Sequence, residues 1–337
     1  MKKFLSLTLM FLFLGSFNCT EAKMFNLHLL KNDTGSIKSV LNSQIKYANK
    51  MNFDKFISTY DKEYKNGDGY NLEIYSKLVK ELWENYNNIK YSIKIKDITF
   101  EDNGLAKVTL VETSHADIPV TKKMCGILHS EANSVYYLKK INGKWKVTSD
   151  VILDEETSML YGDAVDLDIK LTAPLQVTPG YEYTASLEFT PPKDTFAIAS
   201  IAKDKVEYPQ QQPQEVFRKL PEDNILERLF IANKDNANEY VIASIGLTKA
   251  DIKDDFSIKL SLTGFGYRII RVNVVDEKTL SDGGDKTAPA DIKGANSVTK
   301  DDDKTAPAVI KGANSVTKDD DKTTPAVIKE EKDDKKQ

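Results

Sequence analysis

Apolar and polar residues alternate most clearly between Val135 and Val151, on both sides of Asn142-Gly143. Two alternating runs joined by Asn-Gly are the strongest short-range signal of a β-hairpin, and the two-residue turn fixes the strand register. One face of this hairpin is apolar and must be covered. The other face carries Tyr137 among lysines and is expected to be wet. The predicted cross-strand pairs are Lys140 with Trp145, Leu138 with Val147, and Tyr136 with Ser149.

Three amphipathic helices are predicted upstream of the hairpin, where they would cover its apolar face. Apolar residues recur at helical spacing from Ile37 to Met51. Asn52 is predicted to cap a second, short helix that reaches Tyr64, and a third helix is predicted from about Asn71 to Asn87. Candidate N-caps of the first helix are Asp33, Thr34 and Ser36.

Antiparallel strands are predicted between the helices and the hairpin. Residues 91–100 alternate, but the phase slips after Asp97, which indicates a β-bulge and a bent strand. A turn at 102–104 leads into a strand over 105–113, and 114–130 are expected to form a loop or an irregular edge. We therefore predict an α+β domain over 33–155, with helices on one face of a bent antiparallel sheet.

This order of elements resembles the nuclear transport factor 2-like superfamily, which includes ketosteroid isomerase and the SnoaL-like cyclases. The closing run YYLKKINGKWKV carries the resemblance, because Gly143 to Val147 is similar to a GxWKI stretch of bacterial members. The resemblance covers about residues 34–155. It implies a cone of helices and sheet whose open end holds the active site in enzymes. It also implies a dimer through the sheet, unless an attached second domain occupies that face.

The rest of the chain is predicted to form strands, followed by a tail of repeats. Short apolar runs over 165–276, after a connector at 154–164, predict an all-β sandwich-like domain, with Gly264 and Gly266 in a turn before the last strand. An 18-residue motif starts at Asp285 and recurs at Asp303, with a partial third copy. Because these repeats lack aromatic residues and are rich in Asp and Lys, a disordered tail is predicted over 281–337.

The first 22 residues have the features of a signal peptide. A basic start at Lys2-Lys3 precedes an apolar stretch from Phe4 to Phe17, and small residues allow cleavage after Ala22. Cys19 offers the alternative of a lipid anchor. We expect an exported protein, periplasmic or at the cell surface, whose mature chain has no transmembrane segment.

The resemblance directs attention to carboxylates, tyrosines and histidines that could face the cone interior, since enzymes of the superfamily use such groups. If the strand continues straight past Thr113, His115 shares a face with Val111 and could point inward; otherwise it is an edge histidine in a wet loop. The weak catalytic candidates are His115, Asp117, Asp61 and Tyr60, with Tyr64, Glu112 and His129 as further candidates.

The composition of the chain and its lack of known motifs exclude several other functional classes of protein. With 47 Lys and Arg against 51 Asp and Glu, the chain lacks the basic excess of a nucleic-acid binder. No nucleotide or metalloprotease motif occurs, and Cys125 with His129 lacks the further ligands of a metal site, so we expect neither cofactor nor metal. Cleavage after Ala22 leaves Cys125 without a disulfide partner, and a buried thiol is expected there.

These observations favour an exported binding or envelope-associated protein without catalytic activity. Its partner would be a small apolar ligand or an envelope component. One alternative is a ligand carrier or an isomerase- or dehydratase-type enzyme that uses the cone. Another is a surface adhesive or structural protein that acts through the sandwich. Lysines on the outer face of the sheet could meet an anionic polymer, remain solvated or pack against the second domain: Lys94, Lys96, Lys139, Lys144 and Lys146.

Overall fold

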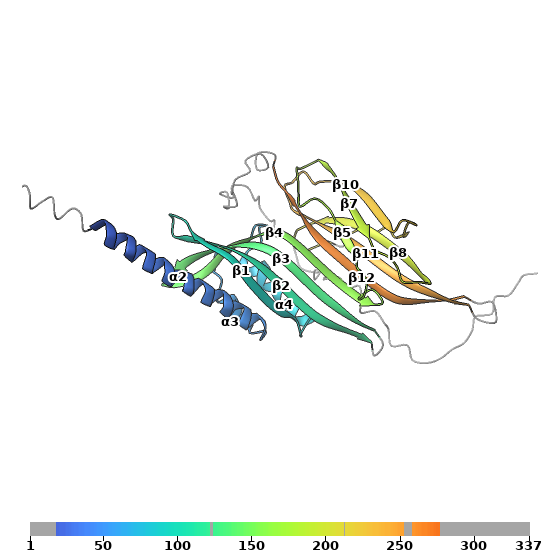
Figure 1. Cartoon of the computed structure of the whole chain (residues 1–337), viewed down its shortest axis with the longest axis horizontal. Coiled ribbons are helices and arrows are strands. Elements are labelled where there is room, and N and C mark those ends of the chain that lie inside the picture. Colours follow the sequence, from blue (N-terminus) through green and yellow to red (C-terminus); the bar gives the residue numbers. More distant parts are fainter. Residues whose placement is uncertain (1–17, 122–123, 212, 253–257, 277–337) are drawn as a thin grey trace, which may run out of the picture.

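A computed structural model describes residues 18–121, 124–211, 213–252 and 258–276, with side chains from residue 33 onward except at 120–121, 251–252 and 258 (Figure 1). The predicted tail lies outside these ranges, as does the predicted signal peptide apart from residues 18–22. The helices are α2 (Asn18–Ala48), α3 (Phe53–Ile57) and α4 (Leu72–Asn85). The strands are β1 (Lys90–Phe100), β2 (Leu105–Thr121), β3 (Met124–Ile141), β4 (Lys144–Gly162), β5 (Lys170–Thr172), β6 (Gln176–Val177), β7 (Glu182–Glu188), β8 (Thr195–Lys205), β9 (Arg218–Lys219), β10 (Ile225–Ile231), β11 (Glu239–Ile252) and β12 (Ile258–Val274).

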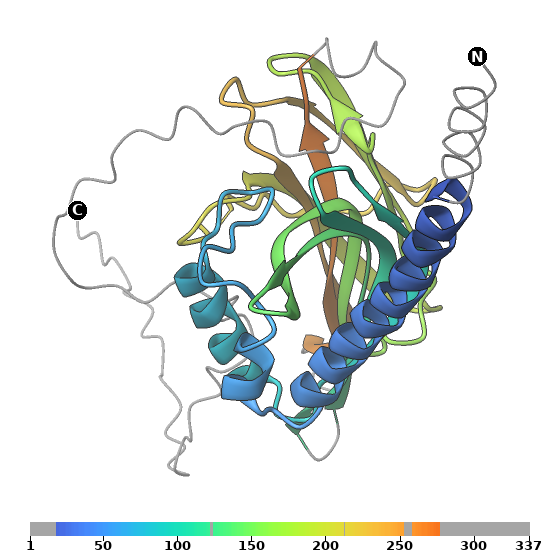
Figure 2. The same cartoon turned by 90° about the vertical axis from the view of Figure 1, so that its left-hand side faces the viewer.

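Strands β1 to β4 curl into the wall of a cone, with α2 beside one side of its mouth and α4 beside the other (Figure 2). One buried apolar cluster joins the helices to this curved sheet. From α2 it takes Ile37 and Leu41, from α4 Trp83, and from the sheet Leu110 and Leu138. The alternation of apolar residues therefore buries one face of each element against the other layer.

Two of the predicted helix starts are confirmed. The side chain of Asn52 accepts a hydrogen bond from the Lys55 amide at 3.3 Å, and that of Asn71 accepts one from the Ile74 amide at 2.9 Å. The start predicted near residues 33–36 is wrong, because α2 runs through that segment without a break. An exposed glycine such as Gly35 costs a helix only about 1 kcal/mol, which is too little to end it.

The second helix is shorter than predicted because its continuation pairs with a strand. After Ile57 the backbone turns and lies along the edge of β4. The Val147 amide donates to the Thr59 carbonyl at 3.0 Å, and the Asp61 amide donates to the Val147 carbonyl at 2.8 Å. This pairing fixes Tyr60 between the helices and the sheet.

The strands confirm some of the predicted irregularities and correct others. The bulge in β1 lies between Ile95 and Asp97. Of the two alternatives for 114–130, the loop is wrong, because β2 and β3 stay paired up to Thr121 and from Met124, with Ala116 and Leu128 buried. The irregular edge is confirmed, since β1 pairs with β2 only as far as His115 and the β2–β3 register shifts between Pro119 and Thr121. The connector predicted at 154–164 is also wrong, since β4 extends to Gly162.

The hairpin has the predicted turn but a different register away from it. Asn142 and Gly143 have φ of 51° and 77°, and Lys140 lies opposite Trp145 as expected. Leu138 lies opposite Val147, but the register shifts next to it, so Tyr136 faces Asp150 instead of Ser149. Tyr137 is buried, although the alternation places it on the wet face.

The second half extends the same sheet and places another sheet against it. The large sheet has the order β1-β2-β3-β4-β12-β11-β8-β9, while β10, β7 and β5 form a three-stranded sheet, and an apolar core lies between the two. Gly264 and Gly266 do not form the predicted turn but lie inside β12. A Cβ at Gly266 would lie 2.6 Å from Leu160, so glycine allows β12 and β4 to approach. The strand predicted from residue 165 is confined to 170–172.

A buried ion pair, here called the interlock, joins the two halves at the loop after α3. Arg271 on β12 donates to both carboxylate oxygens of Asp68, at 2.5 and 3.1 Å, and both side chains are almost fully buried. The Asn238 side chain adds a third donor to Asp68 at 2.8 Å. Burial alone would lower the pKa of Arg271, but the charge and hydrogen bonds of Asp68 reverse this effect and raise it.

Within the described residues, no helix is both long and apolar enough to cross a membrane.

Candidate functional site

Four tyrosines and two carboxylates, here called the cone cluster, meet on the inner face of the curved sheet. Neighbouring strands β2, β3 and β4 supply three of them, the segment after α3 supplies two and α4 supplies one. The members are Tyr60, Tyr64, Tyr75, Glu112, Tyr136 and Asp150.

Each carboxylate of the cone cluster accepts a hydrogen bond from a tyrosine. The Tyr136 hydroxyl donates to Glu112 Oε2 at 2.9 Å, and the Tyr64 hydroxyl donates to Asp150 Oδ1. The hydroxyls of Tyr60 and Tyr75 bond to each other at 2.9 Å. Within the described residues, neither carboxylate forms an ion pair with a lysine or arginine.

Burial is the largest cause of the pKa shifts in this cluster. Burial raises the pKa of Asp150 to about 7, the hydrogen bond from Tyr64 opposes this rise, and the charge of Glu112 adds to it. Burial also raises the pKa of Glu112. The pKa values of Tyr60 and Tyr64 lie well above their ordinary value for the same reason, so both stay neutral donors. The cluster can therefore hold or release a proton near neutral pH.

Aromatic rings fill the cone around these groups. The ring centroid of Tyr60 lies 5.5 Å from that of Phe56, 5.0 Å from that of Tyr64 and 5.1 Å from that of Tyr75. Trp83 and Trp145 are also buried. The interior is thus an aromatic core in which Glu112 and Asp150 keep partial exposure.

The predicted catalytic candidates lie in different parts of the structure. Tyr60 belongs to the cone cluster, but Asp61 contributes only its backbone to the β4 edge. His115 and Asp117 lie on the outer face, with side chains 52% and 80% exposed and 3.5 Å apart. The inward orientation considered for His115 is wrong, because the inward positions of β2 fall on even numbers, including Glu112.

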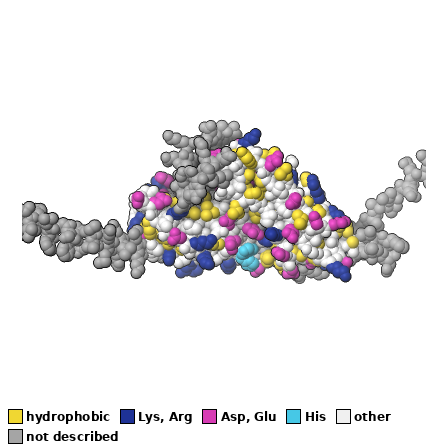
Figure 3. All heavy atoms as spheres, turned by 45° about the horizontal axis from the view of Figure 1, so that its top comes forward, with side chains coloured by type: hydrophobic (Ala, Val, Ile, Leu, Met, Phe, Trp, Pro, Cys, Tyr) yellow, Lys and Arg dark blue, Asp and Glu magenta, His cyan; other side chains and the backbone are white. Residues whose placement is uncertain are grey.

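Two smaller expectations concern the same ribbon. His129 lies opposite His115, and histidine side chains are visible at the surface among interspersed charges (Figure 3). Cys125 is exposed, so the expected buried thiol is wrong. It lies near the end of the β2–β3 ribbon, paired with Pro119. Among the described residues, no group of three or more His, Cys, Asp or Glu side chains could hold a metal ion.

Sequence reasoning missed Asp150, Tyr136 and Tyr75 as members of a polar cluster. Tyr75 and Tyr136 belong to the apolar faces that the sequence predicts. Such a pattern does not show where the hydroxyl group of a tyrosine points. An unshifted register placed Val151 inward and Asp150 outward. The register shift between Tyr137 and Leu138 brings Asp150 opposite Tyr136. Phase slips are hard to detect where both faces of a strand are partly buried.

A second candidate site, here called the hairpin groove, is an open cleft of about 750 Å³ between α2 and the β3–β4 hairpin. One face of α2 lines it with hydroxyl groups at helical spacing, and the turn after α3 adds two more. The hydroxyl-bearing residues are Ser36, Ser39, Ser43, Tyr47, Ser58 and Thr59, and the lysines are Lys140, Lys144 and Lys146.

Polar contacts organise the groove walls. Lys140 forms an ion pair with Asp33 at 2.7 Å, and the Trp145 indole donates to the same carboxylate oxygen at 3.2 Å. The hydrogen bond from Lys140 holds the pKa of Asp33 below its ordinary value. Lys146 donates to the Ser58 carbonyl at 2.5 Å. Lys144 is exposed beside the turn and forms no ion pair within the described residues.

The first half has helices followed by a curved antiparallel sheet, which is the order of elements that the sequence predicts. More particularly, residues 39–157 match the profile of the C-terminal domain of anti-sigma-I factor RsgI9. No curated protein matches the chain.

The solved structures that are similar to part of this chain share little sequence with it. A scytalone dehydratase-like protein from Novosphingobium aromaticivorans is 13% identical, with a TM-score of 0.32, over 38% of this chain and 86% of its own. The hexachlorocyclohexane dehydrochlorinase LinA-type3 from Novosphingobium barchaimii is 12% identical, with a TM-score of 0.30, over 38% of this chain and 88% of its own.

Proposed function

We propose that this chain is an exported, non-catalytic binding protein of the bacterial envelope that holds an anionic, hydroxyl-rich polymer in the hairpin groove. The observation that carries the proposal is the lining of the groove, which combines lysines with hydroxyl groups at helical spacing. Ammonium groups attract phosphate or carboxylate, and hydroxyls exchange hydrogen bonds with a polyol. The lining residues therefore suit an anionic sugar or polyol chain.

The shape of the groove supports a polymer over a small compact molecule. Its volume of about 750 Å³ lies within the range of ligand sites, about 300–1,000 Å³, but it is open along α2. Lys144 forms no ion pair among the described residues, whereas Lys140 and Lys146 are already held by Asp33 and Ser58. A bound chain could thus be gripped by Lys144 without breaking the contacts that shape the groove.

The absence of catalytic activity is supported by how the predicted candidates are distributed. His115 and Asp117 lie on the outer face, remote from the inward-facing Tyr60, so they do not converge with it on one reacting atom. The matching profile is described as part of an anti-sigma factor, which is not an enzyme name. Both points favour a binding protein over an enzyme.

Export is proposed from residues 1–22 and has its own test. Mass spectrometry of the protein purified from its native host should give a mature chain that starts at Lys23. A diacylated chain that starts at Cys19 would replace this proposal with a lipid anchor, and an intact Met1 would overturn export.

Binding is tested by calorimetry of the full mature chain with a glycerol phosphate oligomer and, separately, with an oligogalacturonate. The two ligands distinguish phosphate from carboxylate recognition, and neutral dextran is the control ligand. We expect Lys144→Gln to weaken binding about fivefold, since an exposed charge pair contributes on the order of 1 kcal/mol. Lys94→Gln is the matched control, because Lys94 is exposed on β1 outside the groove. Equal loss in both variants, or no binding of either anion, would overturn the proposed groove.

A second candidate function is a carrier or isomerase- or dehydratase-type enzyme that uses the cone, and one observation favours it. Asp150, with its pKa raised to about 7, lies beside the neutral hydroxyl of Tyr64, and such a pair suits proton transfer. Fluorescence titration with small apolar ketones and alcohols tests it. Saturable binding that Asp150→Asn abolishes while Lys144→Gln preserves would favour this function over the groove.

A further inference from the structure

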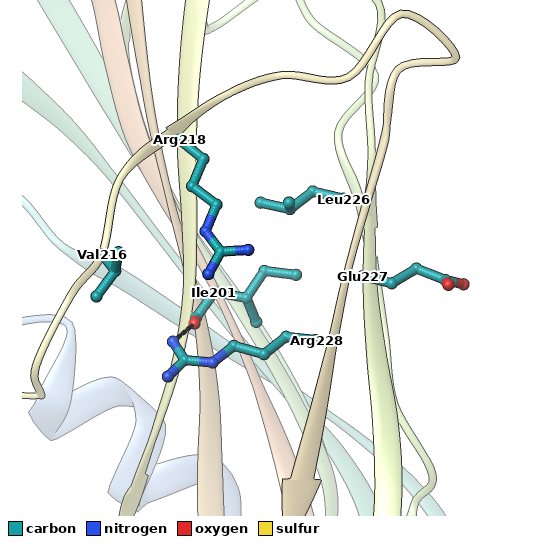
Figure 4. A pocket seen from close by; sticks show the side chains of 6 residues that line it. All are labelled: Ile201, Val216, Arg218, Leu226, Glu227 and Arg228. Atoms are coloured by element: carbon teal, nitrogen blue, oxygen red, sulfur yellow. Dashed lines mark hydrogen bonds between the residues drawn. The ribbon is translucent and has the colours of Figure 1, made fainter.

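A small opening lies on the side of the second half, where the two sheets face each other without closing. It has a volume of about 70 Å³ and lies between β8, β9 and β10. Its walls include the aliphatic side chains of Ile201, Val216 and Leu226 (Figure 4).

Two guanidinium groups converge on this opening. Arg228 donates to the Ile201 carbonyl, and Arg218 reaches into the same space from the opposite wall, while Glu227 points away (Figure 4). Within the described residues, neither arginine forms an ion pair with a carboxylate. Two neighbouring positive charges repel each other, so an added carboxylate would relieve the repulsion and could bond to both.

The opening follows the free edge of β10. This strand pairs only with β7, which leaves the hydrogen-bonding groups of its other edge without a strand partner among the described residues. Leu226 and Glu227 are successive residues that point to opposite faces, and both line the opening. The opening therefore runs beside the backbone of β10, where an added strand would lie.

Apolar side chains flank this edge. Leu229 and Ile231 are 60% and 56% exposed on the outer face of β10, and Val216 and Phe217 are 55% and 46% exposed across the opening. An occupant would thus need a carboxylate facing the arginines and aliphatic side chains facing outward. Alternation along an extended segment provides this pattern when an acidic residue has apolar neighbours.

We propose that the first tail repeat, Pro289-Ala290-Asp291-Ile292-Lys293, adds to the free edge of β10 with the Asp291 carboxylate between Arg218 and Arg228. Ala290 and Ile292 then fall on the outer face beside the aliphatic side chains of β10. Proline at the start of the segment is tolerated on an edge strand, because its missing amide is not needed there.

The position of the chain end allows this docking. The described chain ends at Asp276, whose carboxylate accepts a hydrogen bond from Asn236, five residues after β10 ends at Ile231. The 15 residues from Asp276 to Asp291 can span about 50 Å when extended, which exceeds the reach required. A tethered segment also has an effective concentration of about 1 mM, so a weak contact is sufficient.

The other repeats provide a matched control within the chain. Where the first repeat has Asp291, the second has Val309 and the third has Val327, with the same Pro-Ala before and Ile-Lys after. Only the first repeat carries a carboxylate at this position of the motif, and Asp291→Val gives it the Pro-Ala-Val-Ile-Lys segment of the second.

Hydrogen exchange of the full chain, followed by mass spectrometry of residues 225–231, tests the docking. We expect the β10 edge amides to exchange at least about tenfold faster in Asp291→Val and in Arg218→Gln than in the wild type. Salt at 1 M should accelerate wild-type exchange in the same direction. In the double variant Asp291→Val/Val309→Asp, we expect the second repeat to restore protection.

Two results would overturn the proposal. The first is equal exchange of residues 225–231 in the wild type and Asp291→Val. The second is protection that Asp291→Val leaves intact but Arg218→Gln removes, since another occupant would then hold the arginines. Exchange in β1 is the folding control, because β1 lies at the far edge of the large sheet.

Discussion

The interlock and the cone cluster are both buried polar groups, but among the described residues only the interlock contains an ion pair. In the interlock, Arg271 meets Asp68 through two hydrogen bonds. In the cone cluster, Glu112 and Asp150 accept hydrogen bonds from neutral tyrosines. Asp68 raises the pKa of Arg271, whereas burial raises the pKa values of Asp150 and Glu112 in the cone cluster. The two clusters therefore differ in whether a charged partner or a neutral donor faces the buried group.

The largest effect is expected from breaking the interlock. Arg271→Met leaves the buried Asp68 carboxylate without its cation, and the free energy of unfolding should fall by about 3–5 kcal/mol. Urea denaturation of the full chain measures this change. The control is the double variant Asp68→Asn/Arg271→Met, which removes both charges and should recover most of the loss. A single variant as stable as the wild type would contradict the role of the interlock.

The next effect concerns the pH dependence of the cone cluster. Since the pKa of Asp150 rises on folding from 3.8 to about 7, its contribution to stability is fully present below pH 3.8 and is lost as pH rises through 7. Between pH 5 and pH 8 the wild type should lose about 2 kcal/mol more than Asp150→Asn. Urea midpoints at both pH values measure the difference. Parallel pH profiles would show that Asp150 keeps an ordinary pKa.

A smaller effect is expected within the cone cluster from a neutral hydrogen bond. Tyr60→Phe removes the bond to the Tyr75 hydroxyl while keeping the ring contacts, so stability should fall by about 1 kcal/mol. Tyr86→Phe is the control, because its hydroxyl contacts only the weakly accepting sulfur of Met159. Equal losses in the two variants would mean that the Tyr60 hydroxyl adds nothing specific.

The smallest effect is expected from the exposed histidine. His115→Ala removes a half-exposed side chain 3.5 Å from Asp117, and stability should change by less than about 0.5 kcal/mol. Thermal unfolding at pH 5 and pH 8 measures it. A loss above 1 kcal/mol would contradict the outer placement of His115.

Local signals predicted much of the first half. The Asn-Gly turn, the Asn71 cap and the β1 bulge each depend on neighbouring residues, and each is present. The joining of β4 to β12 could not be read from the sequence, because Gly264 and Gly266 look like turn residues until a strand is placed beside them.

The candidate site was predictable only in part, for a related reason. Tyr60, Tyr64 and Glu112 were recognised as candidates, but Asp150 enters the cone through a register shift that short alternating patterns do not reveal. The interlock could not be predicted from local sequence patterns, because Asp68 and Arg271 are 203 residues apart. The hairpin groove likewise needs α2 to be placed against the hairpin before its lysines and hydroxyls share one surface.

The most direct test of the central claim is an NMR titration of the mature chain with the glycerol phosphate oligomer. The account predicts that amide shifts gather in the hairpin groove, at Ser39, Ser43, Gly143 and Lys144, while Tyr75, Glu112 and Asp150 stay unchanged. Shifts centred on Glu112 and Asp150, with the groove unchanged, would contradict it and place the binding site in the cone.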